Sequence, residues 1–321
     1  MANLSTQIAK GLKTTFYTFA ELRPVHWIKN LSLFAAIIFT GNLFSPEPLL
    51  RVVWAFVIFN LASSATYVFN DILDAKVDRL HPIKKARPIA AGKLSLSTAF
   101  IIIIVFSAAS LYLSSQINPL FFTLIATYLA LQAFYSLKLK NIHILDILII
   151  AAGFVIRVYA GAFVIDVHLS VWFLLCVVST ALFLASGKRR AELSALEQWS
   201  GVTRKSLSKY KPELLNSYVT MFGNAAWMSW SLFTFFESPR AALPVWLFLA
   251  ELSKTTTINK LLMITIPIVI FGIMRYESLI FEGRSEAPEK LLLTDKFLIT
   301  TVLVWLLLII WIFYGGVAIL T

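Results

Sequence analysis

The chain has 321 residues, of which 59% are hydrophobic and only 14% are charged, and its formal net charge is +11. Soluble domains average about 45–50% apolar and about 25% charged residues, so this composition excludes an ordinary soluble fold. It also excludes a disordered chain, which requires low hydrophobicity and high charge. The single cysteine, Cys176, excludes an intramolecular disulfide framework. We therefore predict an all-α polytopic membrane protein that forms a single integral membrane domain over residues 1–321.

The first 25 residues contain scattered charges and no uninterrupted apolar stretch, which argues against a cleavable signal peptide and predicts a short cytoplasmic N-terminal segment. A membrane-crossing helix needs about 20 mostly apolar residues. Such runs fall at 31–45, 50–69, 97–115, 118–136, 145–165, 169–187, 215–236, 260–279 and 296–319. The apolar stretch 241–250 is too short to cross and predicts a re-entrant or interfacial segment. The remaining region, 26–321, is thus predicted to contain nine transmembrane helices.

The distribution of Lys and Arg predicts the orientation of these helices. With the N-terminus in the cytoplasm, the loops on that side carry 23 of the 28 basic residues, and the opposite loops carry 4. Cytoplasmic loops are enriched in Lys and Arg, so we predict a multi-pass protein of the plasma (inner) membrane with an extracytoplasmic C-terminus. Most of the positive charge then lies beside anionic lipid head groups. For any single loop, topology alone is the favoured explanation of the basic residues, but two of these loops carry more than topology requires.

An acidic pattern follows the second predicted span. Asn70, Asp71, Asp74 and Asp78 are spaced one, three and four residues apart, so they share one face if the helix continues. Adjacent carboxylates repel one another unless a cation lies among them, and Mg²⁺ prefers carboxylate oxygens together with water and substrate phosphates. The pattern therefore predicts catalytic carboxylates that bind Mg²⁺, with Asn70 as an additional amide ligand.

Cations follow the acids directly. The segment continues with His81 and with four basic residues, which are Arg79, Lys84, Lys85 and Arg87. Carboxylates followed by cations suit a metal–diphosphate ligand, because the metal bridges acids to phosphates and the cations neutralise the remaining oxygens. The alternative interpretation is a solvated charged loop with local ion pairs. Charges beside a membrane span are costly and usually functional, so we favour phosphate binding.

The acidic and basic motifs together resemble a known signature. N-D-x-x-D-x-x-x-D at 70–78, followed by R-x-H-P-x-K-x-x-R-P-x-A-x-G at 79–92, resembles the first motif of the UbiA prenyltransferase superfamily. The resemblance implies a UbiA-like helical bundle, Mg²⁺ as cofactor and an active cavity that faces the cytoplasm. The nine predicted spans agree with that fold.

Two further positions in the middle of the chain have open interpretations. Tyr135 and Lys140 resemble the superfamily's Y-x-x-x-x-K element, and both side chains could reach a phosphate. An interfacial Tyr with a topology-setting Lys explains them equally well on residue types. Arg157 lies within the fifth span and must point to a protein or aqueous interior. It either lines the active cavity or forms an ion pair with an acid on a neighbouring helix.

The stretch after the sixth span departs from the aromatic-prenylating members of the superfamily. Those enzymes usually have a second aspartate pair here, whereas this chain has Gly187, three cations and an acid, which are Lys188, Arg189, Arg190 and Glu192. Fixed cations imply more phosphate to neutralise. We therefore predict that this stretch contributes to substrate phosphate binding.

The cation-rich version resembles one branch, the decaprenyl-phosphate phosphoribosyltransferases. Three other stretches resemble it as well: R-P-x-x-W-x-K-N at 23–30, which adds Lys29 to the predicted phosphate-binding residues, F-x-I-R-x-x-A-G at 154–161, and E-A-P-E with Asp295 at 286–295. The resemblance implies transfer of the 5-phosphoribosyl group from phosphoribosyl diphosphate to a polyprenyl phosphate. Diphosphate is released, and the product is a precursor of cell-wall arabinan.

Two other functions remain as alternatives. An aromatic-ring prenyltransferase would use polyprenyl diphosphate as the donor on the same acidic residues. A transporter would place ionisable groups near the bilayer midplane, whereas nearly all charges here lie at the predicted cytoplasmic edge. We expect the membrane and the two phosphate substrates as partners and no nucleic acid, and a homo-oligomer is left open.

Overall fold

The computed structural model describes residues 14–81, 83–197, 207–237, 256–282 and 288–315. Within these residues every regular element is a helix. After a first helix at 14–21, the long elements are η1 (Pro24–Leu33), α2 (Phe34–Phe39), α3 (Pro46–Asp78), α4 (Leu96–Ser115), α5 (Pro119–Leu137), α6 (Leu145–Val164), α7 (Val171–Glu197), α8 (Pro212–Phe236), η5 (Thr256–Thr265), α10 (Ile266–Phe281) and α12 (Lys296–Tyr314). Short turns at η2 (Lys84–Ala86), η3 (Leu139–Asn141), η4 (Leu207–Lys209) and α11 (Pro288–Thr294) connect them.

Local sequence signals start several of these helices. Pro46, Pro119 and Pro212 occupy the first turns of α3, α5 and α8, where a missing N–H costs nothing. The side chain of Asn118 accepts a hydrogen bond of 2.7 Å from the Phe121 N–H and thereby caps α5. Asp295 caps α12 in the same way, with 2.9 Å to the Leu298 N–H. Both caps satisfy backbone donors that would otherwise lack partners.

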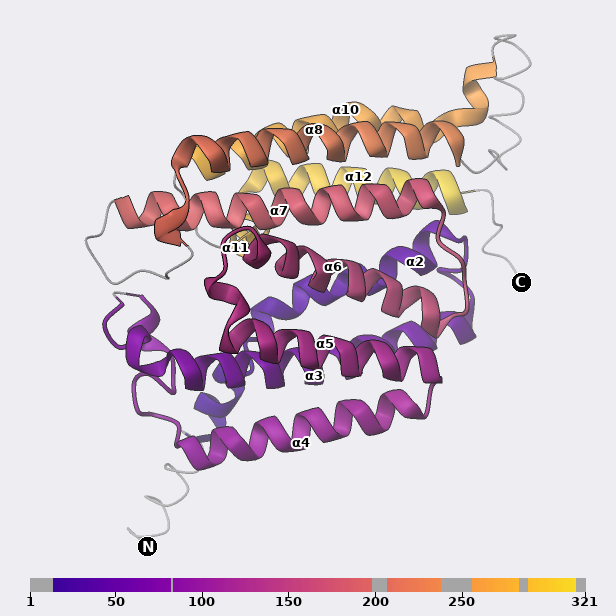
Figure 1. The fold of residues 1–321 in the computed structure, drawn as a ribbon. Coiled ribbons are helices and arrows are strands. Elements are labelled where there is room, and N and C mark those ends of the chain that lie inside the picture. Colours follow the sequence, from indigo (N-terminus) through magenta and orange to yellow (C-terminus); the bar gives the residue numbers. More distant parts are fainter. Residues whose placement is uncertain (1–13, 82, 198–206, 238–255, 283–287, 316–321) are drawn as a thin grey trace, which may run out of the picture.

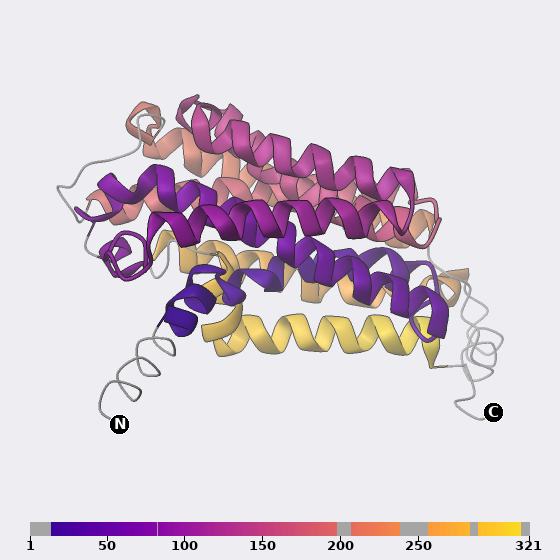
Figure 2. The same cartoon turned by 90° about the horizontal axis from the view of Figure 1, so that it is seen from below.

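The long helices pack as a bundle with nearly parallel axes (Figures 1 and 2). In Figure 1, α4, α3 and α5 form the lower part, α7, α8, α10 and α12 form the upper part, and α6 and α2 lie between them. The contacts agree, since α3 packs on α4 and α5, and α6 packs on α5, α7 and η1. The C-terminal end of α3, the N-terminal end of α6 and the C-terminal end of α7 therefore lie at the same end of the bundle.

Gly161 permits the closest helix contact in the bundle's centre. A Cβ atom placed on Gly161 of α6 would lie 1.9 Å from the carbonyl oxygen of Leu33 on η1. No side chain fits in that space, so only glycine lets η1 approach α6 this closely. The contact fixes η1, which contains most of the 23–30 motif, against the middle of the bundle.

Seven described helices are long and apolar enough to cross a membrane: α3, α4, α5, α6, the 171–194 part of α7, the 260–281 segment and α12. The all-helical membrane architecture is thus confirmed. The predicted span at 31–45 is instead a 3₁₀ segment followed by the short α2, and 215–236 lies in α8, which falls outside these seven. The predicted interfacial stretch 241–250 lies outside the described residues.

Two helices extend beyond their predicted spans. Helix α3 continues from 69 to Asp78, and α7 continues from 187 to Glu197. The predicted end of the sixth span at 187 is therefore not the end of the helix, and the cations of the following stretch lie on α7. Helix α7 continues past 187 because Ala191, Glu192 and Leu193 are good helix formers. The run of apolar residues marks only the part of the helix that lies within the hydrocarbon core of the membrane.

Candidate active site at the charged end of the bundle

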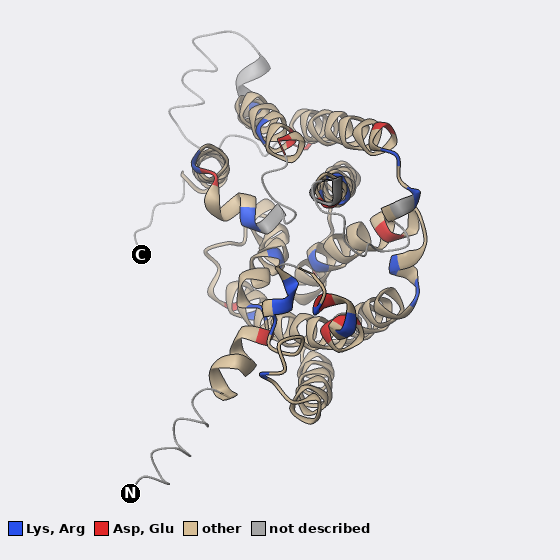
Figure 3. Ribbon diagram, turned by 90° about the vertical axis from the view of Figure 1, so that its left-hand side faces the viewer, with Lys and Arg blue, Asp and Glu red and all other residues tan. Residues whose placement is uncertain are grey.

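Charged residues gather at the end of the bundle where α3 and α7 finish and α6 begins, as Figure 3 shows along the bundle axis. The acidic cluster, which we define as Asn70, Asp71, Asp74 and Asp78, lies on the last three turns of α3. Helix α3 brings these residues to one end of the bundle because it continues past the apolar segment. The acids predicted from their spacing therefore lie together, and cations from three other segments reach them.

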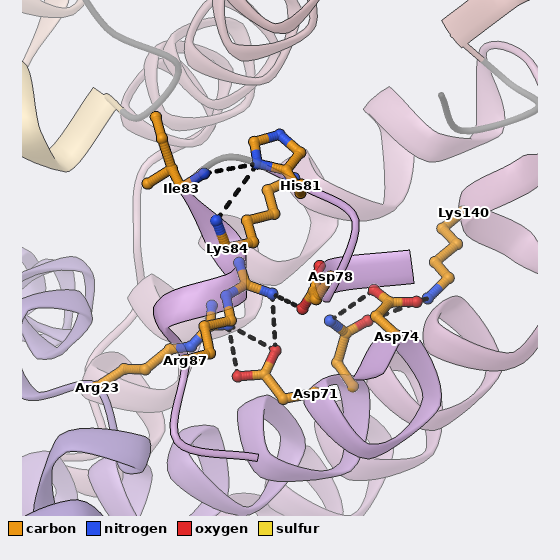
Figure 4. A network of polar contacts seen from close by, with 10 residues as sticks. Arg23, Asp71, Asp74, Asp78, His81, Ile83, Lys84, Arg87 and Lys140 are labelled. Carbon is orange, nitrogen blue, oxygen red and sulfur yellow. Dashed lines mark hydrogen bonds and ion pairs between the residues drawn. The ribbon is translucent and has the colours of Figure 1, made fainter. Parts of the chain in front are cut away.

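Asp71 is buried and bound by two arginines (Figure 4). The Nη2 atom of Arg23 lies 2.5 Å from each of its carboxylate oxygens, and Arg87 Nη1 lies 3.0 Å from Oδ1. The same Arg87 nitrogen lies 2.5 Å from Asp78 Oδ2, so one guanidinium bridges two acids of the cluster. Arg23 precedes η1 and Arg87 follows η2, so both cations come from segments outside α3.

Asp74 has a different cation. Lys140 of η3 donates to Asp74 Oδ1 at 2.6 Å and to Asn70 Oδ1 at 3.2 Å, and the Asn70 amide donates to Asp74 Oδ2 at 3.0 Å. Lys140 is itself buried. The connection between α5 and α6 thus closes one side of the acidic cluster, opposite the arginines (Figure 4).

The carboxylate oxygens of the acidic cluster suit Mg²⁺ that is bound together with a phosphate substrate. Among the described residues, no three acidic, histidine or cysteine side chains converge where they alone could hold a metal ion. Mg²⁺ is usually bound by one or two carboxylates and completed by waters and substrate phosphates. Asp71, Asp74 and Asp78 fit that mode, because carboxylates would hold the metal and the adjoining Arg and Lys side chains suit the remaining phosphate oxygens.

Glu21 is a component of this end that the sequence interpretation missed. Its side chain is only 1% exposed and lies beside Asp71 and Arg23. Burial, and then the neighbouring Asp71 charge, raise the pKa of Glu21 to about 8. In the sequence, Glu21 is one acid among scattered N-terminal charges. Its signal was its position two residues before the Arg23-Pro24 motif.

A second polar group, the arginine cluster, lies where α7 meets α5 and α6. We define it as Arg189, Asp146, Glu192, Tyr135 and Tyr210. Arg189 is 1% exposed; its Nε lies 2.7 Å from Asp146 Oδ2, its Nη2 donates to the Tyr135 hydroxyl at 2.6 Å, and its Nη1 binds Glu192. All of its guanidinium nitrogens therefore have protein partners, and two of those partners are acids. Tyr135 and Lys140, predicted together, belong to different clusters.

Tyr210 and Asp146 complete this cluster. The Tyr210 hydroxyl donates to Asp146 Oδ1 at 2.7 Å and accepts from the Ile144 N–H at 2.8 Å. Burial, and then this bond to Asp146, raise the pKa of Tyr210 well above its usual range. Ile144 has a φ of 70°, which is unusual for a β-branched residue. Tyr210 thus ties the segment before α8 to the start of α6.

Arg157 lies deeper, within the spans. Its Nε donates to Asn30 Oδ1 at 2.6 Å, Nη1 to the Gly153 carbonyl at 2.6 Å, and Nη2 to the Tyr128 hydroxyl at 3.0 Å. The guanidinium also lies over the Phe59 and Tyr128 rings. The predicted alternative of an ion pair between Arg157 and an acid is therefore not found among the described residues. The partners of the guanidinium are all neutral.

The other predicted phosphate-binding cations are spread around the same end. Arg79 donates to the Ala90 carbonyl at 3.1 Å and so secures its own loop. Lys29 Nζ lies 3.2 Å from His26 Nδ1, and Arg190 Nε donates to Asn216 at 2.6 Å. The remaining three are exposed or half-buried: Lys84, Lys85 and Lys188. In the 286–295 stretch that resembles the branch, Asp295 pairs with Arg275 at 2.6 Å. Glu286 and the side chain of Glu289 lie outside the described part of the chain.

An apolar cavity of about 470 Å³ extends from this end into the bundle. Lys29 and Ser32 of η1 contribute polar groups to the wall of this cavity. Its walls come from α2, α6, α7, α8, α10 and α12 and include Phe39, Phe154 and Trp305. A cavity of this kind suits an apolar chain whose charged head remains at the basic end.

These features define a multi-pass helical membrane protein whose one charged end combines carboxylates with cations. The UbiA prenyltransferase family matches residues 31–249, and the chain belongs to this family. The chain is 34% identical to a decaprenyl-phosphate phosphoribosyltransferase of Corynebacterium glutamicum, over 90% of this chain and 84% of that protein. It is 35% identical to the protein of that name from Mycolicibacterium smegmatis, over 89% and 88%. These relatives confirm the predicted branch.

The fold is also that of a solved structure. A UbiA homologue from Archaeoglobus fulgidus, with DMAPP and Mg²⁺ bound, superimposes with a TM-score of 0.65 over 94% of this chain and 99% of that one. At 17% identity this likeness concerns the fold alone. It places the described helices in the UbiA-like arrangement predicted from the motifs.

Proposed function

We propose that this protein transfers the 5-phosphoribosyl group from phosphoribosyl diphosphate to a polyprenyl phosphate of decaprenyl type and releases diphosphate, in the synthesis of cell-wall arabinan precursors. One observation carries the proposal: relatives aligned over about 90% of the chain share the name decaprenyl-phosphate phosphoribosyltransferase. Identity near 34% along whole chains supports a common reaction more strongly than a shared fold does.

The charges at the site support a reaction between two phosphate-rich substrates. The donor carries a diphosphate and a 5-phosphate, and the acceptor lipid carries another phosphate. Arg23, Arg87 and Lys140 adjoin the acidic cluster, and Lys29, Lys84 and Lys188 lie at the same end. Charge-assisted hydrogen bonds from such groups are roughly twice as strong as neutral ones.

The reaction would be a displacement at the anomeric carbon of the ribose. The bond from that carbon to the diphosphate oxygen breaks, a bond to a lipid phosphate oxygen forms, and diphosphate leaves with the electron pair. Mg²⁺ held by Asp71, Asp74 and Asp78 would stabilise the charge on the diphosphate. Arg87 and Lys140 would turn from these acids to the diphosphate oxygens. The acceptor phosphate is already anionic, so binding, orientation and charge stabilisation carry the catalysis.

We also propose the placement of the molecule in the membrane. The η1–α2 segment and α8, added to the seven apolar helices, give nine crossings within one integral membrane domain over 1–321. The positive-inside distribution puts the N-terminus and the charged end on the cytoplasmic side of the plasma membrane. The polyprenyl chain would occupy the apolar cavity, and its phosphate would lie near Lys29.

The proposal is tested with membranes that contain the protein, labelled phosphoribosyl diphosphate and polyprenyl phosphates of several lengths. Transfer of the label into the organic phase, dependent on the lipid and on Mg²⁺, is the expected result. Consumption of a hydroxybenzoate with polyprenyl diphosphate, and no use of phosphoribosyl diphosphate, would instead identify an aromatic prenyltransferase.

A further inference from the structure

The carboxylate of Asp71 is already fully engaged with protein cations. Both of its oxygens lie 2.5 Å from Arg23 Nη2, and Oδ1 also lies 3.0 Å from Arg87 Nη1. The Asp71 side chain is 2% exposed and that of Arg23 is 17% exposed. A divalent cation can therefore reach Asp71 only if Arg23 moves away.

A second acid, Glu21, lies beside this pair and is 1% exposed. In the described part of the chain, no donor meets normal hydrogen-bond geometry at Oε1 or Oε2, and the polar neighbours of this side chain are Asp71, Arg23 and the Ile89 backbone. Glu21 interacts electrostatically with both Asp71 and Arg23. A buried acid without a partner is unfavourable, so Glu21 is prepared to accept a cation from its surroundings.

The backbone between the two residues is itself unusual. Arg23 has a φ of 54°, in the left-handed region that favours glycine, and it joins the helix at 14–21 to η1. Non-glycine residues persist in this region only where the surroundings impose it, and they concentrate at ligand clamps and switch segments. Glu21 and Arg23 thus stand on one strained turn at the edge of the acidic cluster.

We propose that Arg23 holds the place of the metal at Asp71, and that Glu21 accepts the Arg23 guanidinium when Mg²⁺ and the donor diphosphate occupy Asp71. Both are positioning residues that act through Asp71. The inference rests on the proposed function, because it takes Asp71 as a metal ligand. It adds an exchange in which Asp71 keeps a cation throughout, Arg23 before the donor binds and Mg²⁺ afterwards, while Arg23 passes to Glu21.

The test measures Mn²⁺ binding to the purified full-length protein by electron paramagnetic resonance, without donor or lipid. Arg23→Gln should tighten Mn²⁺ binding, since the competing cation is gone. Glu21→Gln should weaken it by about tenfold, the scale of residues that act behind a metal ligand. In the double variant the effect of Glu21→Gln should nearly vanish, because Glu21 acts only by receiving Arg23.

Two further variants control this test. Lys76→Gln makes the same charge change on an exposed position of α3 and should leave Mn²⁺ affinity nearly unchanged. Arg23→Lys keeps the charge but loses the guanidinium contact with both Asp71 oxygens, so it should tighten binding less than Arg23→Gln. It also allows the test to proceed if Arg23→Gln does not fold.

The outcomes separate this inference from the proposed function. Weaker Mn²⁺ binding in both Arg23→Gln and Arg23→Lys would overturn the proposed movement of Arg23 from Asp71 to Glu21. The same follows if Glu21→Gln lowers Mn²⁺ affinity equally in the wild-type protein and in the Arg23→Gln variant. Neither result affects the transferase proposal. A wild-type protein that binds no Mn²⁺ overturns the metal assignment of the proposed function and this inference with it. Phosphoribosyl transfer by the wild-type protein is measured in parallel.

Discussion

The Nε atom of Arg157 on α6 donates a hydrogen bond of 2.6 Å to Oδ1 of Asn30 on η1, across 127 residues of sequence. The Asn30 amide in turn donates to Asn60 at 2.6 Å and to Ser63 at 3.0 Å on α3. This buried network joins η1, α6 and α3 below the acidic cluster. Because η1 begins directly after Arg23 and contains Lys29, the network sets where those cations reach the charged end.

Arg157→Met should therefore destabilise the protein. The substitution removes the N–H groups that donate to the Asn30 side-chain carbonyl and to the Tyr128 hydroxyl. Each unsatisfied buried group costs about 1–3 kcal/mol. The measurement is unfolding in mixed detergent, followed by helical circular dichroism. Arg51→Met is the control, since Arg51 forms an exposed pair with Glu47 and such pairs contribute about 0–1 kcal/mol. Equal stability of the two variants would contradict the proposed role of Arg157.

Asp74→Asn should abolish phosphoribosyl transfer while the protein still inserts and unfolds normally. The substitution keeps the shape of the side chain but removes a charge that faces Lys140 and, in our proposal, the metal. Excess EDTA should stop the wild-type reaction, and Mg²⁺ should restore it. Asp166→Asn, at an exposed turn between α6 and α7, is the matched control and should keep its activity. Full wild-type activity in EDTA would refute the magnesium assignment.

Arg189→Gln should act on stability more than on substrate affinity. Removing Arg189 leaves Asp146 and Glu192 as uncompensated acids, and breaking a buried ion pair costs about 3–5 kcal/mol. Lys188→Gln, one residue earlier and half-buried, should leave the unfolding midpoint nearly unchanged. Both variants are compared by unfolding and by the KM for phosphoribosyl diphosphate. A raised KM with normal stability in Arg189→Gln would show instead that this arginine binds phosphate directly.

Thr180→Trp should reduce the use of long polyprenyl phosphates. Thr180 lines the apolar cavity, and an indole there would occupy space that we assign to the lipid chain. The KM for decaprenyl phosphate should rise, and that for a short polyprenyl phosphate should change less. Thr123→Trp makes the same change on an exposed face of α5 and serves as control. Equal kinetics of the two variants with the long lipid would place the chain elsewhere.

Local features of this protein could be predicted from the sequence. The apolar runs predict helices in a membrane, because backbone groups in lipid must be satisfied within a helix. The spacing of Asp71, Asp74 and Asp78 predicts a shared helix end, since positions three and four apart lie together. The motif also predicts the family, which the comparisons confirm.

Features that depend on distant contacts could not be predicted. Arg23 and Asp71 are 48 residues apart, and Lys140 and Asp74 are 66 apart, so their pairing requires the packed bundle. Arg189 looks like a surface cation in the sequence, yet α7 continues as a helix and buries it against Asp146. Glu21 has only its position two residues before Arg23 as a sequence signal, and its burial beside Asp71 requires the packed bundle.

Mass spectrometry of the lipid formed from phosphoribosyl diphosphate and decaprenyl phosphate shows directly whether the protein transfers the phosphoribosyl group. Purified full-length protein is incubated with both substrates and Mg²⁺, with the Asp74→Asn variant in parallel. We expect a polyprenyl-phosphoryl-pentose phosphate and free diphosphate with the wild-type protein only. An unchanged lipid, or a prenylated aromatic product with polyprenyl diphosphate as donor, would contradict it.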